Sequence, residues 1–155
     1  MSNARVFAVE NKLAEIARQP GGKTAAEAVR AAEKRVEAQR SVSLASLIEK
    51  AEQMSALTAN GRDDPEVFAR IYDISNATFG LAAAFGLKAL SEAALSLCDL
   101  ADAFRSGEAP NWPAIEVHVD GIRLLASLGE KAGAAGAESI LDGLRRVRAR
   151  VLPTG

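Results

Sequence analysis

The chain has one histidine, His118, and one cysteine, Cys98, so few side chains are of the types that carry nucleophilic or acid–base chemistry. His118 supplies the only imidazole for acid–base work or for transfer of a phosphoryl group. On a helix it would project close to Ile115, Ile122 and Leu125, and this favours a histidine in the core or at its edge. The alternative, phosphoryl transfer through His118, requires an exposed imidazole.

A metal or disulfide site is not expected from these residues. One cysteine cannot form an internal disulfide, and one cysteine with one histidine cannot assemble a Cys/His metal cluster. Cys98 has apolar neighbours and is typical of an inert, small hydrophobic residue. There is no glycine-rich phosphate loop, no Ser/His/Asp set and no carboxylate pair at a convincing spacing. We therefore expect no enzyme, no metal and no cofactor.

The overall charge and hydropathy exclude two classes of partner. The 19 basic and 20 acidic residues give a net charge of -1, which lacks the excess that drives binding to a phosphate backbone. No apolar run approaches the roughly 20 residues that cross a bilayer. The first residues are also not followed by the apolar stretch of a signal peptide. We expect a cytoplasmic protein with no nucleic-acid or membrane partner.

The composition favours an all-α fold. The chain has 155 residues, alanine dominates, only five prolines occur, and the alternation typical of strands is nearly absent. Capping and breaking residues divide the chain into a short arm at 1–22, which ends at Pro20-Gly21-Gly22, and a series of helices. The predicted helices span about 24–57, 64–85, 87–105, 111–128 and 137–151.

Local signals fix the helix starts. Thr24 and Glu27 form a capping box, in which each side chain can bond the other residue's backbone amide. Asp64 precedes Pro65, and Asn111 stands just before Pro113, so each is placed to cap a helix whose first turn accepts proline.

The helices and their short connections predict one domain. Residues 24–131 are expected to form an antiparallel up-down four-helix bundle, with the helix at 137–151 packed on it. The first helix, about 34 residues at roughly 1.5 Å each, is much longer than the second. Its overhang must pack on the arm, on the last helix, or on a second copy of the protein.

The second predicted helix has two distinct faces. At 100° per residue its apolar residues cluster on one side, which we expect to be the core side: Val67, Ile71, Ile74, Thr78, Leu81 and Phe85. Asn76 points the opposite way, among small residues flanked by two aromatic ones. We name this outward surface the Asn76 face; it comprises Ala69, Tyr72, Asp73, Asn76, Phe79, Gly80 and Ala83.

Gly80 and the two aromatic residues of this face each have two interpretations. A glycine inside a helix costs about 1 kcal/mol relative to alanine, so Gly80 indicates close approach by another molecule or by a neighbouring helix of the same bundle. Tyr72 and Phe79 belong either to an interface or to packing against the first or third helix.

The sequence of residues 71–86, Ile-Tyr-Asp-Ile-Ser-Asn-Ala-Thr-Phe-Gly followed by Leu-Ala-Ala-Ala-Phe-Gly, resembles the phosphoacceptor helix of a histidine phosphotransfer (HPt) domain. That family carries His-x-x-Lys-Gly on the second helix of a four-helix bundle. Aligning its glycine on Gly80 puts Asn76 at the histidine position and Phe79 at the lysine position. The resemblance covers about 65–128 and is strongest over 76–90.

The resemblance implies a docking scaffold without the phosphotransfer chemistry. An asparagine amide is not nucleophilic, Phe79 supplies no cation, and Asp73 would repel a phosphoryl group. The expected function is a non-catalytic HPt-like module of two-component, phosphorelay or chemotaxis signalling. It would dock a response-regulator receiver domain or a histidine kinase, or compete with a true phosphotransfer protein. The alternative is a structural helical adaptor, or a homodimer joined through the first helix.

Overall fold

The computed structural model describes residues 21–22, 24–131 and 133–152, and this part of the chain is helical with no strand. The prediction of an all-α protein is therefore confirmed. The elements are α2 (Ala25–Asn60), α3 (Val67–Ala84), α4 (Lys88–Arg105), α5 (Trp112–Leu128), the short 3-10 helix η1 (Gly129–Lys131) and α6 (Ala134–Val151). The predicted arm at 1–22 lies outside the described residues except for its last two glycines.

Helix α2 begins where its capping box predicts. The backbone amide of Glu27 donates to Oγ1 of Thr24 over 3.2 Å, and the amide of Thr24 donates to Oε2 of Glu27 over 2.7 Å. Two of the amides left free at a helix start are thereby satisfied. The amide and the hydroxyl of Thr24, which both donate to the Glu27 carboxylate, hold the pKa of Glu27 below its ordinary value. The helix continues past the predicted end, to Asn60.

The turn between α3 and α4 makes these two helices antiparallel neighbours. Gly86 adopts φ +73°, a left-handed conformation that glycine takes without strain. The amide of Leu87 donates to the carbonyl of Ala82 over 2.9 Å, and that of Gly86 donates to Ala83 over 3.1 Å. This pair of bonds is the Schellman motif, which ends a helix and reverses the chain within a few residues.

Helix α5 begins where the sequence predicts, whereas helix α6 begins earlier than predicted. Oδ1 of Asn111 accepts the amide of Ala114 over 3.0 Å and caps α5 as predicted. Helix α6 begins at Ala134, before the predicted start at Ala137. Gly136 lies in its first turn, where the amides lack intrahelical partners in any case, so a glycine there does not end the helix.

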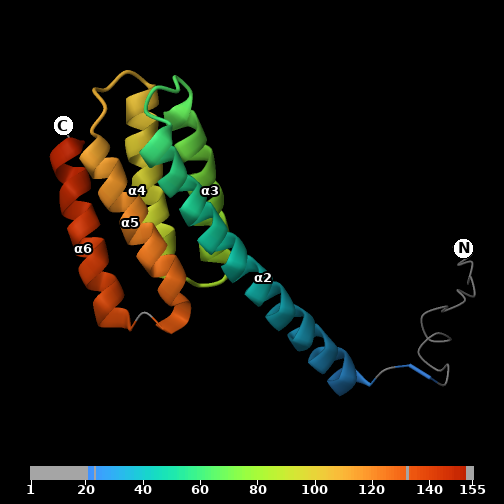
Figure 1. Ribbon diagram of the computed structural model, residues 1–155. Coiled ribbons are helices and arrows are strands. Elements are labelled where there is room, and N and C mark those ends of the chain that lie inside the picture. Colours follow the sequence, from blue (N-terminus) through green and yellow to red (C-terminus); the bar gives the residue numbers. More distant parts are fainter. Residues whose placement is uncertain (1–20, 23, 132, 153–155) are drawn as a thin grey trace, which may run out of the picture. The chain divides into compact units, whose positions relative to one another are not determined.

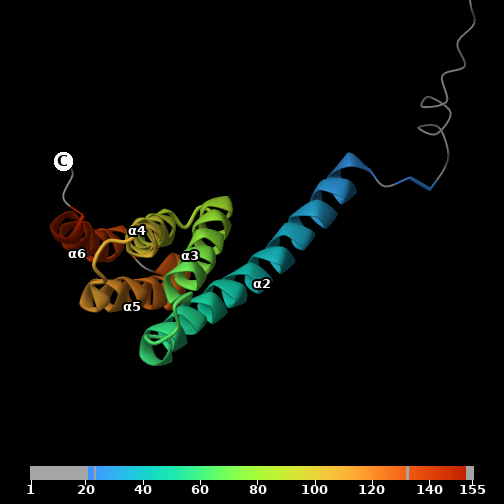
Figure 2. The same cartoon turned by 90° about the horizontal axis from the view of Figure 1, so that it is seen from above.

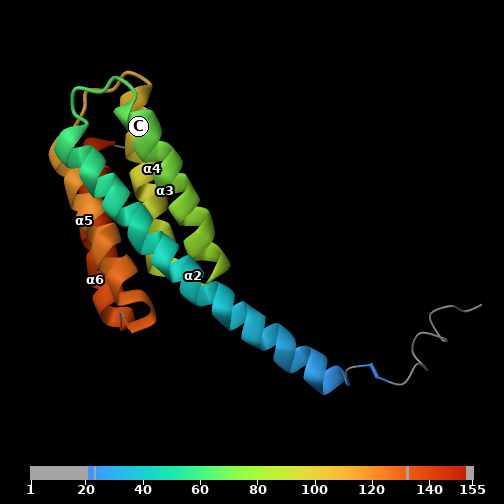
Figure 3. The ribbon, with the colours of Figure 1, turned by 45° about the vertical axis from the view of Figure 1, so that its right-hand side comes forward.

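Contacts divide the chain into two units, Met1–Ala38 and Gln39–Gly155. In the second unit the helices form two layers. Figure 2 shows α3, α4 and α6 in one layer, with α5 and the part of α2 that follows Gln39 in the other. Consecutive helices run in opposite directions, and this part of α2 lies alongside α5 and α3 (Figures 1 and 3). Helix α6 packs against α4 and α5.

The core of this second unit is built from aliphatic side chains and alanines contributed by all five helices. Its largest fully buried aliphatic members are Leu47, Met54, Val67, Ile71, Leu97, Leu100, Ile115, Val119 and Ile122. At one end the ring of Phe68 lies 5.4 Å from that of Phe104 and 5.1 Å from that of Trp112. Within the described residues, no helix combines the length and the hydrophobicity needed to cross a bilayer.

The buried side of α3 is rotated from the predicted one. Its buried residues are Val67, Ile71, Ser75, Thr78 and Ala82, whereas Ile74, Leu81 and Phe85 of the predicted core side are only partly buried. Helix α4 is the closest neighbour of α3, and small side chains let the two backbones approach. The prediction was wrong on this point because hydrophobicity alone placed the larger residues at the centre. Leu128, at the end of α5, is 37% exposed.

Candidate docking face on helix α3

Asn76 lies on the side of α3 that is turned away from the core. Asp73, Asn76, Gly80 and Ala83 are all exposed, and Ala69 is partly buried. The residues one step toward the core, Ser75 and Thr78, are fully buried, and their hydroxyls donate to carbonyls of the same helix. The helix is therefore anchored on one side and leaves the amide of Asn76 to solvent on the other.

The space above Gly80 is open. A β-carbon built on this residue meets no heavy atom within 4 Å. The interpretation that the glycine admits a neighbouring helix of the same bundle is therefore wrong for the described part of the chain. Nothing in that part requires glycine here, while a mid-helix glycine destabilises the helix. The remaining interpretation is close approach by another molecule.

The two aromatic residues pack on the flank of α3 and remain partly exposed. Both lie against the core cluster. The guanidinium of Arg105 stacks over the ring of Tyr72, 4.0 Å from its centroid. The hydroxyl of Ser91 on α4 donates to the carbonyl of Phe79 over 3.3 Å. Packing against the core cluster, with Arg105 of α4 over the ring of Tyr72, therefore accounts for part of the burial of these two residues, which lie one turn before and one turn after Asn76.

A shallow groove of about 330 Å³ extends this face onto α4. It is lined by Phe79, Ala83, Gly86, Lys88, Ser91, Glu92 and Leu95. Leu95 is 44% exposed, although it is a large aliphatic residue. The α4 residues of this groove were not predicted from the sequence. A signal was present, because Leu95 lies outside the three-four series formed by Leu90, Ala94, Leu97, Ala101 and Phe104 on α4.

Asp73 of the Asn76 face and Lys88 of the neighbouring groove are charged residues that form no ion pair within the described part of the chain. In this they differ from most arginines of the second unit, which do take part in ion pairs. A surface charge without an ion-pair partner can pair with an opposite charge on a docking molecule, and no ion pair within its own chain has to break first. Asp73 stands one turn before Asn76, and its carboxylate disfavours a phosphoryl group at that position.

His118 lies in the core, as its apolar neighbours predict. It has 0% exposure, Nδ1 lies 2.7 Å from the carbonyl of Ala114, and Nε2 lies 2.9 Å from the hydroxyl of Ser96. Burial lowers its pKa, and the positive charge of Arg148 adds to this effect. Both nitrogens are engaged within the protein. The structure therefore does not provide the exposed imidazole that phosphoryl transfer through His118 requires.

Cys98 is also buried, with 5% exposure. Its Sγ lies 3.0 Å from the hydroxyl of Ser75, at the close crossing of α4 and α3. Burial raises the pKa of the thiol, so the reactive thiolate is disfavoured. A packing residue is the interpretation that fits this environment.

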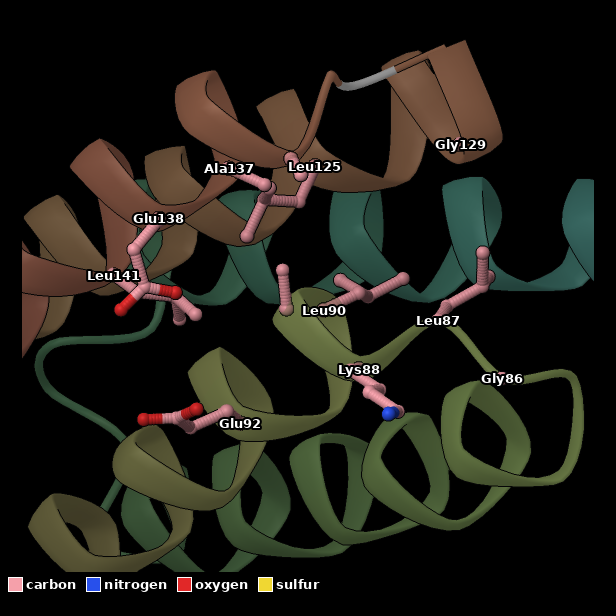
Figure 4. Close-up of a pocket in the computed structure, with 12 residues that line it drawn as sticks. Gly86, Leu87, Lys88, Leu90, Glu92, Leu125, Gly129, Ala137, Glu138 and Leu141 are labelled. Atoms are coloured by element: carbon pink, nitrogen blue, oxygen red, sulfur yellow. The ribbon is translucent and has the colours of Figure 1, made fainter.

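A larger hollow lies where the start of α4 meets the end of α5 and the start of α6 (Figure 4). It has a volume of about 530 Å³ and an apolar floor that includes Leu90, Leu125 and Leu141. Its two carboxylates, Glu92 and Glu138, each bond Arg145 at 2.6 Å. No residue of the Asn76 face lines this hollow, and its carboxylates are already held in ion pairs rather than free to perform chemistry.

Comparison of the chain with protein-family models, with curated proteins and with solved structures finds no match. What the protein does must therefore be inferred from its own residues and their arrangement.

Proposed function

We propose that this protein is a non-catalytic, HPt-like signalling module that docks the receiver domain of a response regulator through the Asn76 face. One observation carries the proposal: Asn76 is exposed, and the space over Gly80, one turn away, is open. A backbone can approach α3 most closely at this point. In the HPt family, the glycine that follows the phosphoacceptor is understood to serve this purpose.

The proposal takes the second unit as an HPt-like four-helix bundle with one added helix. The part of α2 after Gln39, with α3, α4 and α5, supplies four consecutive helices joined by short connections. Helix α3 then corresponds to the helix that carries the family's histidine, and α6 covers α4 and α5 on the other side. The two layers and the antiparallel order support this assignment (Figures 1 and 2).

In this proposal the module acts by occupying the docking surface of its partner, without a chemical step. Asn76 cannot form a phosphoramidate bond, Phe79 brings no cation, and Asp73 opposes a phosphoryl group, so the docked partner keeps its phosphate. A receiver held in this way is withheld from a true phosphotransfer protein. A histidine kinase is the other partner that such a face would fit. Either partner would place the protein in the cytoplasm.

The docking surface extends onto α4. The groove beside Phe79 offers apolar surface at Leu95, and Lys88 adds a positive charge at its edge. Apolar contact at the centre with charges at the rim is the usual arrangement of a transient protein interface. A partner that fills this groove gains affinity that the small residues around Gly80 cannot provide on their own.

A pair of matched glycine variants tests the proposal. Gly143 on α6 is, like Gly80, an exposed glycine inside a helix, and a β-carbon added to it would meet nothing within 4 Å. Lysine at either position removes the same helix penalty and adds the same charge. Binding to the receiver domains of the same cell is then measured by titration calorimetry. We expect Gly80→Lys to weaken binding at least about tenfold, equivalent to about 1.4 kcal/mol, and Gly143→Lys to leave it unchanged.

Two outcomes of this titration count against the docking face. Equal affinity for the wild type and both variants would show that the partner does not contact α3 at Gly80. Equal weakening by both variants would indicate a nonspecific effect of the added charge. Because both substitutions favour the helix, loss of binding by unfolding is excluded when the melting temperature does not fall.

A purely structural function, as an adaptor or homodimer joined through the first helix, is the second candidate. The observation that favours it is the exposure of apolar residues early in α2, with Val29 at 56% and Val36 at 62%. This function makes no use of the Asn76 face. Absence of binding to every receiver domain, with a stable self-association, would support it over the first.

A further inference from the structure

The first turns of α2 carry an apolar seam that is exposed in the described chain. Ala25, Val29, Ala32 and Val36 follow one another at spacings of four, three and four residues, and all four are exposed. Val29 and Val36 have 56% and 62% of their surface accessible. This spacing places the four side chains in one line along a helix, as in the seam of a coiled coil.

The remaining positions of this segment show that the seam is a distinct face. Residues outside it are largely charged and of both signs, with Glu33 and Arg35 beside the seam and Glu27, Arg30, Lys34 and Glu37 farther round the helix. The Thr24–Glu27 capping box fixes the start of the helix at the end of the seam. A capped helix with one apolar line and a charged remainder is the form in which an α-helix pairs with another helix.

We infer that the seam binds the same seam of a second copy of this chain, with the two helices antiparallel. In that register Ala25 packs against Val36 of the second copy, and Val29 packs against Ala32. Each layer then joins one large and one small side chain, so the layers have equal volume along the contact. The alanines also let the two helices approach closely, which increases the packing of both valines.

The layers of the seam differ between the two orientations. In a parallel pair, Val29 and Val36 would meet the same valines of the second copy and the alanines would meet alanines, so large and small layers would alternate. In the antiparallel pair Arg35 faces Ala28, and Glu33 faces Ala26. No like charges meet, and the alanines leave room for the aliphatic parts of the longer side chains. The antiparallel orientation therefore joins a valine with an alanine in every layer without opposing like charges.

This inference does not depend on the proposed receiver docking. If both hold, one dimer carries two Asn76 faces and can engage two partners, or one partner that is itself dimeric, with a gain in overall affinity. If docking fails, the seam still predicts a homodimer.

Disulfide trapping in the full-length protein tests the register and the orientation. The variants are Ala25→Cys and Val36→Cys, with Lys34→Cys on the outer side of the same helix as the control. In the antiparallel pair, position 25 of one chain lies opposite position 36 of the other. Two copies of position 25 are then about 16 Å apart along the axis, too far for a disulfide, which needs α-carbons within about 7 Å. The native Cys98 is buried and does not take part.

We expect rapid cross-linking when the Ala25→Cys and Val36→Cys chains are mixed in a glutathione buffer. Neither variant alone, nor any mixture with Lys34→Cys, should cross-link above background. Cross-linking of Ala25→Cys with itself would show a parallel pair and overturn the inference. No cross-linking in any mixture, together with a monomer mass in sedimentation at the same concentration, would also overturn it. That last result would leave another part of the same chain, such as residues 1–20, as the cover of the seam.

Discussion

The hydroxyl of Ser96 on α4 lies 2.9 Å from Nε2 of His118 on α5. The other ring nitrogen, Nδ1, lies 2.7 Å from the carbonyl of Ala114, which can only accept, so Nδ1 carries the proton. In the neutral ring Nε2 is then the acceptor, and Ser96 donates to it. The single imidazole of the chain is thus a neutral link between two helices inside the core.

Acidification should destabilise the protein through His118. Burial lowers its pKa in the folded state, so the unfolded chain binds a proton near the ordinary value of 6.5 while the folded protein does not. Stability is therefore complete above about pH 6.5 and falls as the pH drops toward the folded-state pKa, with a slope of at most about 1.4 kcal/mol per pH unit. Urea unfolding at several pH values between about 7 and 5.5 measures this slope.

The control for this prediction is His118→Gln. The glutamine cannot titrate, so the variant should be less stable than the wild type at neutral pH, with a flatter dependence on pH in the same range. An identical slope in both proteins would assign the pH dependence to other groups. It would also show that His118 does not resist protonation in the folded state.

Ser96→Ala should destabilise the core although only a hydroxyl is lost. The substitution leaves Nε2 of His118 buried without a donor, and a buried polar atom without a partner costs about 1–3 kcal/mol. The matched control is Ser127→Ala, because the exposed hydroxyl of Ser127 donates only to Leu124 within its own helix. Its effect on the free energy of unfolding should stay within about 0.5 kcal/mol. Equal effects at the two positions would contradict a specific bond to His118.

The same substitution at two glycines should change stability in opposite directions. Gly80→Leu places a side chain in open space and removes a mid-helix glycine, so the free energy of unfolding should rise by up to about 1 kcal/mol. At Gly121 even a β-carbon would lie 3.1 Å from Cδ1 of Leu144 on α6. Gly121→Leu should therefore overpack the crossing of α5 and α6 and cost about 1–3 kcal/mol.

Chemical denaturation of the two glycine variants, with Gly143→Leu as a second open position, gives the comparison. Gly143→Leu should behave like Gly80→Leu. A destabilising Gly80→Leu would mean that part of the chain covers Gly80, and the proposed docking face would lose its open centre.

Local features of the fold could be predicted from the sequence because they depend on residues close together in the chain. The capping box of Thr24 and Glu27 and the cap by Asn111 involve partners three residues apart, and both form as the sequence indicates. The exposure of Asn76 follows equally from helical spacing. These features need no knowledge of which helices become neighbours.

Features that depend on neighbouring helices could not be predicted in this way. Ser75 takes a central buried position because Cys98, on another helix, approaches its hydroxyl. Ser96 and His118 are 22 residues apart, and nothing local in the sequence pairs them. The groove beside Phe79 likewise exists only because α4 lies next to α3. Hydrophobicity identified which helices are amphipathic, but the small residues decided how closely they pack.

Restoring the family's acceptor residue provides the sharpest test of the alignment on Gly80. In Asn76→His combined with Asp73→Asn, an exposed imidazole stands at the histidine position without the neighbouring carboxylate. If a receiver docks with its aspartyl phosphate above this position, the imidazole can displace the aspartate and take the phosphoryl group. Incubation with a phosphorylated receiver should then give an acid-labile label on the variant and none on the wild type. A variant that binds the receiver as tightly as the wild type but stays unlabelled would place the partner's phosphate elsewhere, and the correspondence of Asn76 to the phosphoacceptor would be wrong.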